Sequence, residues 1–194
     1  MKTKKAVFLG VAILMMVSLM LPLGCTTDTD TETTTEFKTY SGFGFSFDYP
    51  RGYSITEMGL LESEATDSSG SISAAKGDNR LYQVAWMSMI ENVWEIGGGL
   101  QFQIDNFFFG MEMTGEVRVD KGELVESVKA GHEMVYQFYS MTYNEIDKAY
   151  GIIGVFYCDR SEKCFILVTG HTDISAKQDV LEDYQRFLDS FVCH

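Results

Sequence analysis

Residues 150–157 read Tyr-Gly-Ile-Ile-Gly-Val-Phe-Tyr, and residues 165–168 read Phe-Ile-Leu-Val. Both stretches carry apolar residues at odd and even positions alike. Because successive side chains of a β-strand point to opposite faces of its sheet, these two strands have two apolar faces. A sheet that contains them must be covered on both sides, so the sequence predicts a three-layered domain.

Two segments have the apolar spacing of helices that could cover such a sheet. In residues 98–113, apolar side chains recur at intervals of three and four, which is one face of a helix; they are Leu100, Ile104, Phe107, Phe108 and Met111. Near the C-terminus, Ser175 and Gln178 form a capping-box pattern. The apolar stripe that follows consists of Val180, Leu181, Tyr184, Phe187, Leu188, Phe191 and Val192.

The remaining elements are predicted to be strands. Residues 43–50 read Phe-Gly-Phe-Ser-Phe-Asp-Tyr-Pro, which places four aromatic rings on one face of a strand. Strand signals follow in residues 54–62, 70–76 and 81–90, and four strands in meander order in 115–119, 131–143, 148–158 and 164–171, with 124–129 as a lead-in to the second. Connections this short favour antiparallel pairing. We therefore predict an α+β fold, an α-β-α sandwich with a central, mainly antiparallel sheet, one mid-chain helix and one C-terminal helix.

This order of elements resembles the PsbP-like family over residues 37–192. The resemblance lies in the aromatic strand ending Phe-Ser-Phe-Asp-Tyr-Pro (45–50), the mid-chain helix, the meander opening at Gly131, and the final helix ending Phe-Leu-Asp-Ser-Phe (187–191). It implies an α-β-α sandwich of the kind found in extrinsic photosystem subunits, a Ran-binding nuclear import factor and prokaryotic lipoproteins, most of which bind other proteins. No residue here matches those used for photosystem docking, so the resemblance carries over no site.

The N-terminus has the order of parts of a secretory signal peptide. Three lysines among the first five residues precede an uncharged, largely apolar run at 6–20, and Leu-Pro-Leu-Gly leads into Cys25. This ending resembles the lipobox of prokaryotic lipoproteins, although Pro22 and Leu23 stand where that motif has leucine and a small residue. It predicts a signal peptide at 1–24, lipidation of Cys25, and a place on the extracytoplasmic face of the cell membrane. The alternative is an uncleaved helical anchor, because residues 6–24 come close to the ~20 residues that span a bilayer.

Composition limits what the exported part can bind. The threonine-rich and acidic run at 26–36 has no apolar residue, so residues 25–36 are predicted to be a lipidated cysteine and linker, followed by one globular domain at 37–194. The chain has a formal charge of −13, and loss of the leader with its three lysines makes it −16. This charge repels nucleic acid and anionic lipid surfaces. We expect no nucleic-acid partner, and membrane contact through the anchor alone.

The sequence offers no recognisable catalytic or metal centre. The three histidines, His132, His171 and His194, lie far apart without HExxH spacing, and no Gly-x-Ser-x-Gly motif occurs. We therefore predict no catalytic residues, no metal ligands and no cofactor, and a protein that is not an enzyme.

The cysteines suggest one cross-link. Cys158 and Cys164 bracket the polar loop 159–163 between two apolar strands, and an exported protein can oxidise. The spacing predicts that these two form a disulfide across the hairpin and that Cys193 is left as the odd thiol.

Aromatic residues near the mid-chain helix are the candidate binding residues. Trp94 precedes this helix, and Phe102 and Phe109 fall off its main stripe. They could form an exposed contact patch, line a pocket for an apolar ligand, or pack beneath a neighbouring loop. The leading hypothesis is a non-enzymatic lipoprotein whose domain binds an envelope protein. The alternative is a carrier or sensor of a small apolar ligand in a cleft near this helix, and a hydrolase with an unfamiliar site is a third, weaker reading.

Overall fold

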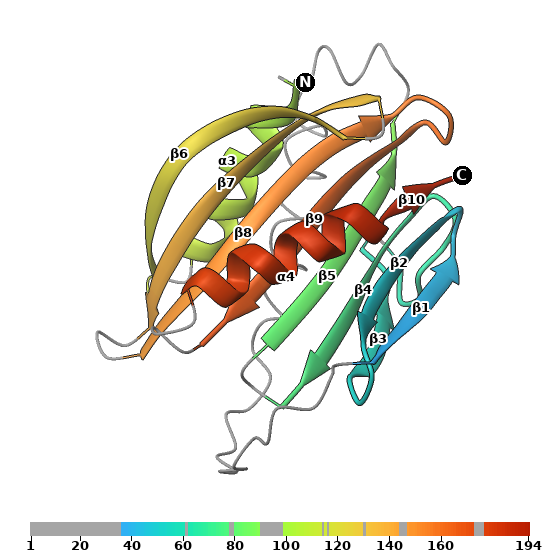
Figure 1. The fold of residues 1–194 in the computed structure, drawn as a ribbon. Helices are drawn as coiled ribbons and strands as arrows, with labels where there is room; N and C mark the ends of the chain where they lie inside the picture. Colours follow the sequence, from blue (N-terminus) through green and yellow to red (C-terminus); the bar gives the residue numbers. More distant parts are fainter. Residues whose placement is uncertain are drawn as a thin grey trace.

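A computed structural model describes residues 36–194, apart from 61, 78–79, 90–98, 114, 116, 130, 144–146 and 173–176. Within these residues the chain forms two antiparallel sheets and two helices (Figure 1). Neither of these helices is long and apolar enough to cross a membrane. The predicted leader and Cys25 lie outside the described residues, as does Ser175, the predicted helix cap.

The large sheet has seven strands in the order β3-β4-β5-β9-β8-β7-β6. Every neighbouring pair in it is antiparallel. The strands are β3 (Ser54–Met58), β4 (Ser69–Lys76), β5 (Arg80–Ser88), β6 (Val117–Lys129), β7 (His132–Tyr143), β8 (Asp147–Cys158) and β9 (Lys163–His171). The last four follow one another as the predicted meander, so the two doubly apolar strands, β8 and β9, lie inside the sheet.

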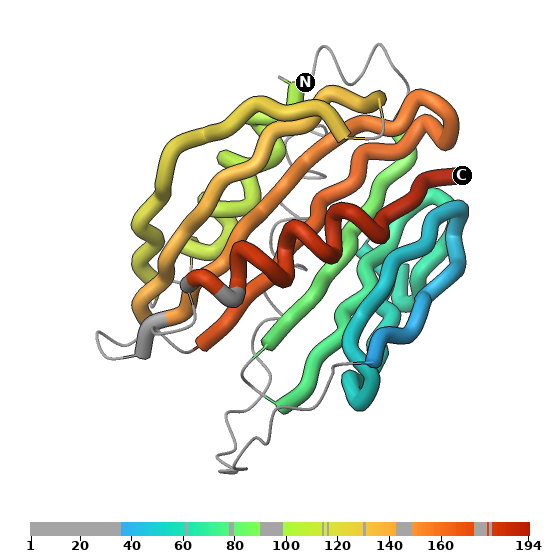
Figure 2. Tube along the Cα trace, in the orientation of Figure 1, coloured from blue at the N-terminus to red at the C-terminus, as the bar shows by residue number. Residues whose placement is uncertain are grey.

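A second, three-stranded sheet joins the two ends of the domain. β1 (Phe37–Gly42) and β2 (Phe45–Pro50) form a hairpin, and β10 (Val192–Cys193) pairs with the other edge of β2. Figure 2 shows the C-terminal end of the chain, in red, meeting this hairpin, in blue. The first and last strands of the domain therefore stabilise each other directly.

The two helices cover opposite faces of the large sheet, which confirms the predicted α-β-α sandwich (Figure 1). α4 (Lys177–Ser190) and β2 pack on one face, and α3 (Gly99–Glu112) packs on the other. Strands β8 and β9 serve both layers, as their sequence requires. Towards α4 they contribute Ile152, Phe156, Phe165 and Leu167, and towards α3 they contribute Ile153, Val155, Ile166 and Val168.

Polar contacts mark where each helix ends. Gly115, with a φ of +72°, donates its amide to the Glu112 carbonyl (3.0 Å) after α3, a position that favours glycine. At the end of α4, the Ser190 hydroxyl donates to the Phe187 carbonyl (2.9 Å) and accepts the amide of Asp48 (3.0 Å). Ser190 thus fixes the end of α4 to strand β2.

The predicted strand at 43–50 is shorter than its alternating aromatics indicated. Phe43 and Gly44 form the two-residue turn between β1 and β2, with φ values of +49° and +76°. Positive φ at both positions is what a tight type I′ hairpin turn requires. Phe43 leaves the strand for this reason, and its ring stacks on Trp86 with centroids 4.8 Å apart.

The lead-in at 124–129 is part of one long strand. β6 pairs with β7 along its length, and a register shift between Lys121 and Leu124 accommodates Gly122. Residues 115–119 and 124–129, which the sequence suggested were separate, are joined by a bulge. A bulge adds a residue to one strand without ending it.

The predicted disulfide between Cys158 and Cys164 is wrong. In the β8–β9 hairpin Cys158 pairs with Lys163, and Cys164 pairs with Tyr157. This offset of one residue places the two cysteines on opposite faces of the sheet, with Cys158 in the core under α4 and Cys164 in the core under α3. Cys158 is instead bonded to Cys193, with 6.8 Å between their Cα atoms, and Cys164 is a buried free thiol.

Candidate functional site

Two of the predicted binding residues lie on the outer surface of α3. Phe102 and Phe109 are 39% and 55% exposed, and Met113, just past the helix, is 45% exposed. Trp94 lies outside the described residues. Positions 102, 109 and 113 are seven and four residues apart, so on a helix they follow one line. We call these three residues the α3 apolar stripe.

The opposite side of α3 is fully used by the core. Ile104, Phe107 and Phe108 are buried against the sheet, and both phenylalanines make edge contacts with Tyr139, at centroid distances of 6.1 and 5.3 Å. The space between helix and sheet is thus filled by side chains of the helix itself. Phe102 and Phe109 belong to the other side of the helix, where both rings are partly exposed, Phe109 more than Phe102.

Acidic residues flank the apolar stripe. Asp105 and Glu112 are exposed on the same outer side of α3, and the helix carries no lysine or arginine. Lys121 of β6 lies over the ring of Phe108 at 4.8 Å from its centroid, in a cation-π contact. The outer face of α3 therefore combines apolar rings with negative charge.

Away from α3, a polar cluster joins α4 to the first residue of β5 and the last residue of β9. The buried ring of His171 lies with Nε2 3.0 Å from Oδ2 of Asp183, and Arg80 approaches the same carboxylate oxygen at 3.6 Å. Burial, and then the negative charge of Asp183, raise the pKa of Tyr82 above its usual range. Burial also raises the pKa of Tyr53, to about 12, although the positive charge of Arg80 opposes this. The cluster places a carboxylate of α4 between groups from β5 and β9.

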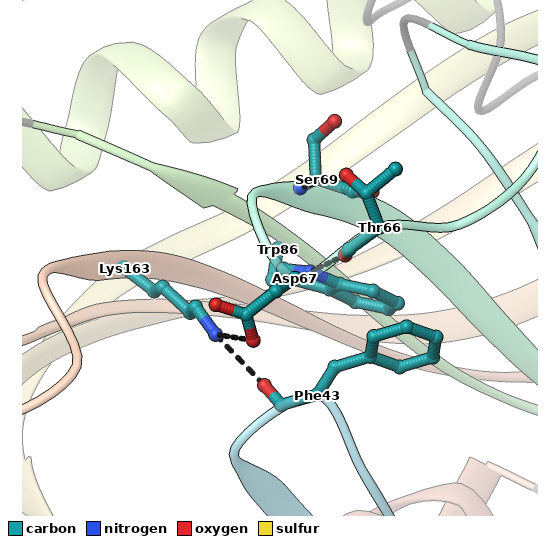
Figure 3. A network of polar contacts seen from close by, with 6 residues as sticks. All are labelled: Phe43, Thr66, Asp67, Ser69, Trp86 and Lys163. Carbon is teal, nitrogen blue, oxygen red and sulfur yellow. Dashed lines mark hydrogen bonds and ion pairs between the residues drawn. The ribbon is translucent and has the colours of Figure 1, made fainter.

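Another polar cluster surrounds the buried ammonium of Lys163, at the start of β9 (Figure 3). Its Nζ donates to the carbonyl oxygen of Phe43 and to Oδ1 of Asp67, both at 2.8 Å. Beside it, Nε1 of Trp86 donates to the carbonyl of Thr66 at 3.0 Å. The side chain of Lys163 is 5% exposed, whereas that of Asp67 is 81% exposed. These contacts hold the β1–β2 turn and the loop before β4 against β9, which is a structural role.

Sequence reasoning found the exposed aromatics but missed the groups that the fold brings together. Lys163 stands in a run of charged residues that reads as a solvated hairpin loop, and its partner Asp67 is 96 residues away. His132 is isolated from the other histidines in the sequence, yet its Nε2 lies 3.4 Å from Sγ of Cys193. No local spacing could reveal either contact, because both depend on the pairing of distant strands.

The sequence matches no protein-family model, and it has no significant match among curated proteins. Solved structures do match. The cyanobacterial PsbP (CyanoP) of Synechocystis sp. PCC 6803 is 11% identical, with a TM-score of 0.62, and the match covers 87% of this chain and 98% of that one. The Ran-binding protein Mog1p of Saccharomyces cerevisiae is 8% identical, with a TM-score of 0.53, over 82% of this chain and 96% of that one. The chain thus has the PsbP-like fold that its sequence indicated.

Proposed function

We propose that this protein is a non-enzymatic, lipid-anchored protein of the extracytoplasmic membrane face that binds an envelope protein through the outer surface of α3. The observation that carries the proposal is the α3 apolar stripe. Helices cover both faces of the central sheet, and the exposed side chains of Phe109 and Met113 are not part of the core beneath α3. Apolar side chains gathered on one exposed face are typical of a contact surface.

The fold is compatible with this function. A structure of similar fold, Mog1p, is a Ran-binding protein, so the sandwich can present a surface to a protein partner. Phenylalanine and methionine are enriched in the centres of protein interfaces. The polar clusters at His171 and Lys163 tie elements of this domain together, and neither presents a recognisable catalytic arrangement.

The charge of the domain indicates the kind of partner. Asp105 and Glu112 flank the stripe, and the whole chain carries a formal charge of −13. A partner with basic residues around an apolar pocket would complement this surface. Attraction between the two would speed association at low salt more than it would strengthen the final complex.

The anchoring part of the proposal rests on residues 1–36. A leader ending at Gly24, a cysteine and a linker without apolar residues would hold the domain at the membrane surface while leaving it free to turn. Exchange of Cys25 for serine should abolish acylation and leave the leader uncut. If the processing and mass of the Cys25→Ser protein are unchanged, the lipid anchor is wrong and a helical anchor is the better account.

Partner binding can be tested by exchanging one residue on the outer face of α3. Full-length protein carrying Phe109→Ser should lose proteins that the wild type captures from envelope extracts of its own host, while its unfolding temperature stays the same. Leu181→Ser is the matched control, because Leu181 is an apolar residue of α4 with 45% exposure on the opposite side of the sandwich. Capture should survive that change. Equal capture by all three proteins would overturn the role of α3, and a stoichiometric apolar ligand found by native mass spectrometry, with no captured protein, would favour the carrier reading.

A further inference from the structure

Three side chains able to bind a metal meet at the C-terminal end of the domain. His132, Cys158 and Cys193 offer Nε2 and two sulfur atoms that all lie within 4.8 Å of one another. Cys158 and Cys193 are joined by the disulfide, and Nε2 of His132 lies 3.4 Å from Sγ of Cys193. The cluster belongs to the α4 side of the sheet and is separate from the outer face of α3.

Strand pairing holds these three residues together. In the β7–β8 ladder Met134 pairs with Phe156, and the same register continued by one alternation sets His132 opposite Cys158. The imidazole ring of His132 stacks on Phe156, with centroids 5.8 Å apart and an interplanar angle of 27°. Cys193 lies on β10, where it pairs with Phe45 of β2. Each of the three is thus fixed by a different strand.

We propose that reduction of the Cys158–Cys193 disulfide converts this cluster into a binding site for a thiophilic divalent cation of the Zn²⁺ class. A dithiol reductant transfers two electrons and two protons to the disulfide, which yields two thiols and the oxidised reductant. The cation then replaces the two thiol protons, which pass to water, and Nε2 of His132 supplies a lone pair as the third ligand. A water molecule takes the fourth position.

The distances suit tetrahedral coordination. Zn–S and Zn–N bonds of about 2.3 and 2.0–2.1 Å place neighbouring ligand atoms about 3.5–3.8 Å apart. The contact between Nε2 of His132 and Sγ of Cys193, at 3.4 Å, is already close to this spacing. The two sulfur atoms must separate, and the Cα atoms of Cys158 and Cys193, 6.8 Å apart, lie at the wide end of the range for disulfides. β10 is two residues long, so a small shift of Cys193 is sufficient.

The charges and burial also suit such an ion. Two thiolates, a neutral imidazole and a divalent cation sum to zero, which permits binding beside the fully buried Cys158. Cys193 and His132 are half-buried, so solvent can reach the cluster from one side. Thiolate and imidazole ligands select Zn²⁺ over the hard cations Mg²⁺ and Ca²⁺. The resulting site would exist in the reduced protein and be closed by oxidation.

The test uses full-length protein in detergent with Cys25→Ser and Cys164→Ser, which leaves Cys158 and Cys193 as its only thiols. After reduction and removal of the reductant without air, Co²⁺ serves as the optical probe. We expect one equivalent to bind with a thiolate-to-cobalt charge-transfer band, and Zn²⁺ to displace it. The disulfide form should bind none. A reduced protein that unfolds, or that gives no such band, overturns the site, as does equal binding by the oxidised form.

Histidine variants separate a third ligand from a bystander. His132→Gln should weaken Co²⁺ binding to the reduced protein by at least about tenfold, the lower end of what even supporting groups of metal sites contribute. His194→Gln is the control, because this neighbouring histidine contacts Ser46 at 3.4 Å and is not part of the cluster. Circular dichroism of the reduced proteins establishes that both variants fold. Equal affinity of the two variants would remove His132 from the site.

Discussion

Lys163 shows how a single buried charge can connect three segments of the chain. Its ammonium is shared by a carbonyl of the β1–β2 turn and a carboxylate of the loop before β4. The carboxylate of Asp67 is mostly exposed, so this ion pair contributes little by itself. The hydrogen bond from Nζ to the carbonyl oxygen of Phe43 contributes more to stability, because it is part-buried. It also holds a tight turn in which Phe43 adopts a positive φ.

We predict that Lys163→Met lowers the free energy of unfolding by about 1–3 kcal/mol, the cost of leaving a buried polar group without its partner. Lys76→Met is the matched control, because Lys76 is an exposed residue at the end of β4, and it should change stability by less than about 0.5 kcal/mol. Urea unfolding followed by tryptophan fluorescence is suitable, since Trp86 lies in the same network. Equal midpoints for the two variants would contradict the assigned role of Lys163.

The cysteines show where residue-level prediction reaches its limit. A five-residue loop between Cys158 and Cys164 is consistent with a bridge across the hairpin, but the pairing offset decides which face each side chain takes. The sequence leaves that offset open by one residue. The true partner, Cys193, follows a helical stripe and becomes a neighbour of Cys158 only through β10, a strand too short to produce a sequence pattern.

At the level of elements, prediction from sequence worked wherever the apolar pattern was long. The doubly apolar β8 and β9 required two covering layers, and the core-facing apolar side chains of α3 and α4 supplied them. Phe102 and Phe109 lie off the core-facing side of α3, as their spacing predicts, because a helix has only one such side. The pattern did not reveal β1, since none of its side chains is fully buried. It also did not reveal the separate small sheet, which depends on contacts between the two ends of the domain.

Packing between α4 and β8 provides a test at this scale. A Cβ atom at Gly154 would overlap the hydroxyl of Tyr184 and lie 2.9 Å from the side chain of Met134. Tyr184 is held in the core beside Tyr136, so the ring must move together with the helix. We predict that Gly154→Ala lowers the free energy of unfolding by about 1–3 kcal/mol, as overpacking does.

Gly170→Ala is the control for this prediction. Gly170 lies in the adjacent strand β9, and a Cβ atom there would approach nothing closer than the carbonyl oxygen of Tyr150, at 3.7 Å. Its exchange should be neutral or slightly stabilising, because alanine loses less backbone freedom on folding than glycine. Thermal unfolding of the two variants gives the comparison. A neutral Gly154→Ala would mean that α4 can shift away from the sheet without cost.

For the whole molecule, the Cys158–Cys193 disulfide joins β8 of the central sheet to β10 of the small sheet. It links residues 35 positions apart, for which the chain-entropy model gives about 4 kcal/mol of stabilisation. The reduced protein loses this contribution. A cation bound by the native state alone would offset part of the loss by mass action, so metal binding and the integrity of the small sheet are coupled in the proposed reduced form.

Burial of several ionisable groups makes the whole domain sensitive to alkaline pH. Burial raises the pKa of the Cys164 thiol, and it raises the pKa of Tyr82, Tyr139 and Tyr184 above the usual range for tyrosine. In the unfolded chain these groups ionise near pH 8.5 for cysteine and about pH 10 for tyrosine. Their stabilisation is therefore fully present below those values. Above them the unfolded chain releases protons that the native state retains, and stability falls as pH rises.

We predict a decline that begins near pH 8.5 and steepens above about pH 10, where each tyrosine ionised only in the unfolded chain removes about 1.4 kcal/mol per pH unit. Guanidinium unfolding at a series of pH values, with reversibility checked at each, measures the slope. Tyr139→Phe is the informative variant, because Tyr139 is 1% exposed and its ring packs against Phe107 and Phe108. Loss of its hydroxyl should make the decline above pH 10 shallower by the contribution of one proton, and identical slopes for the two proteins would show that Tyr139 ionises in the native state.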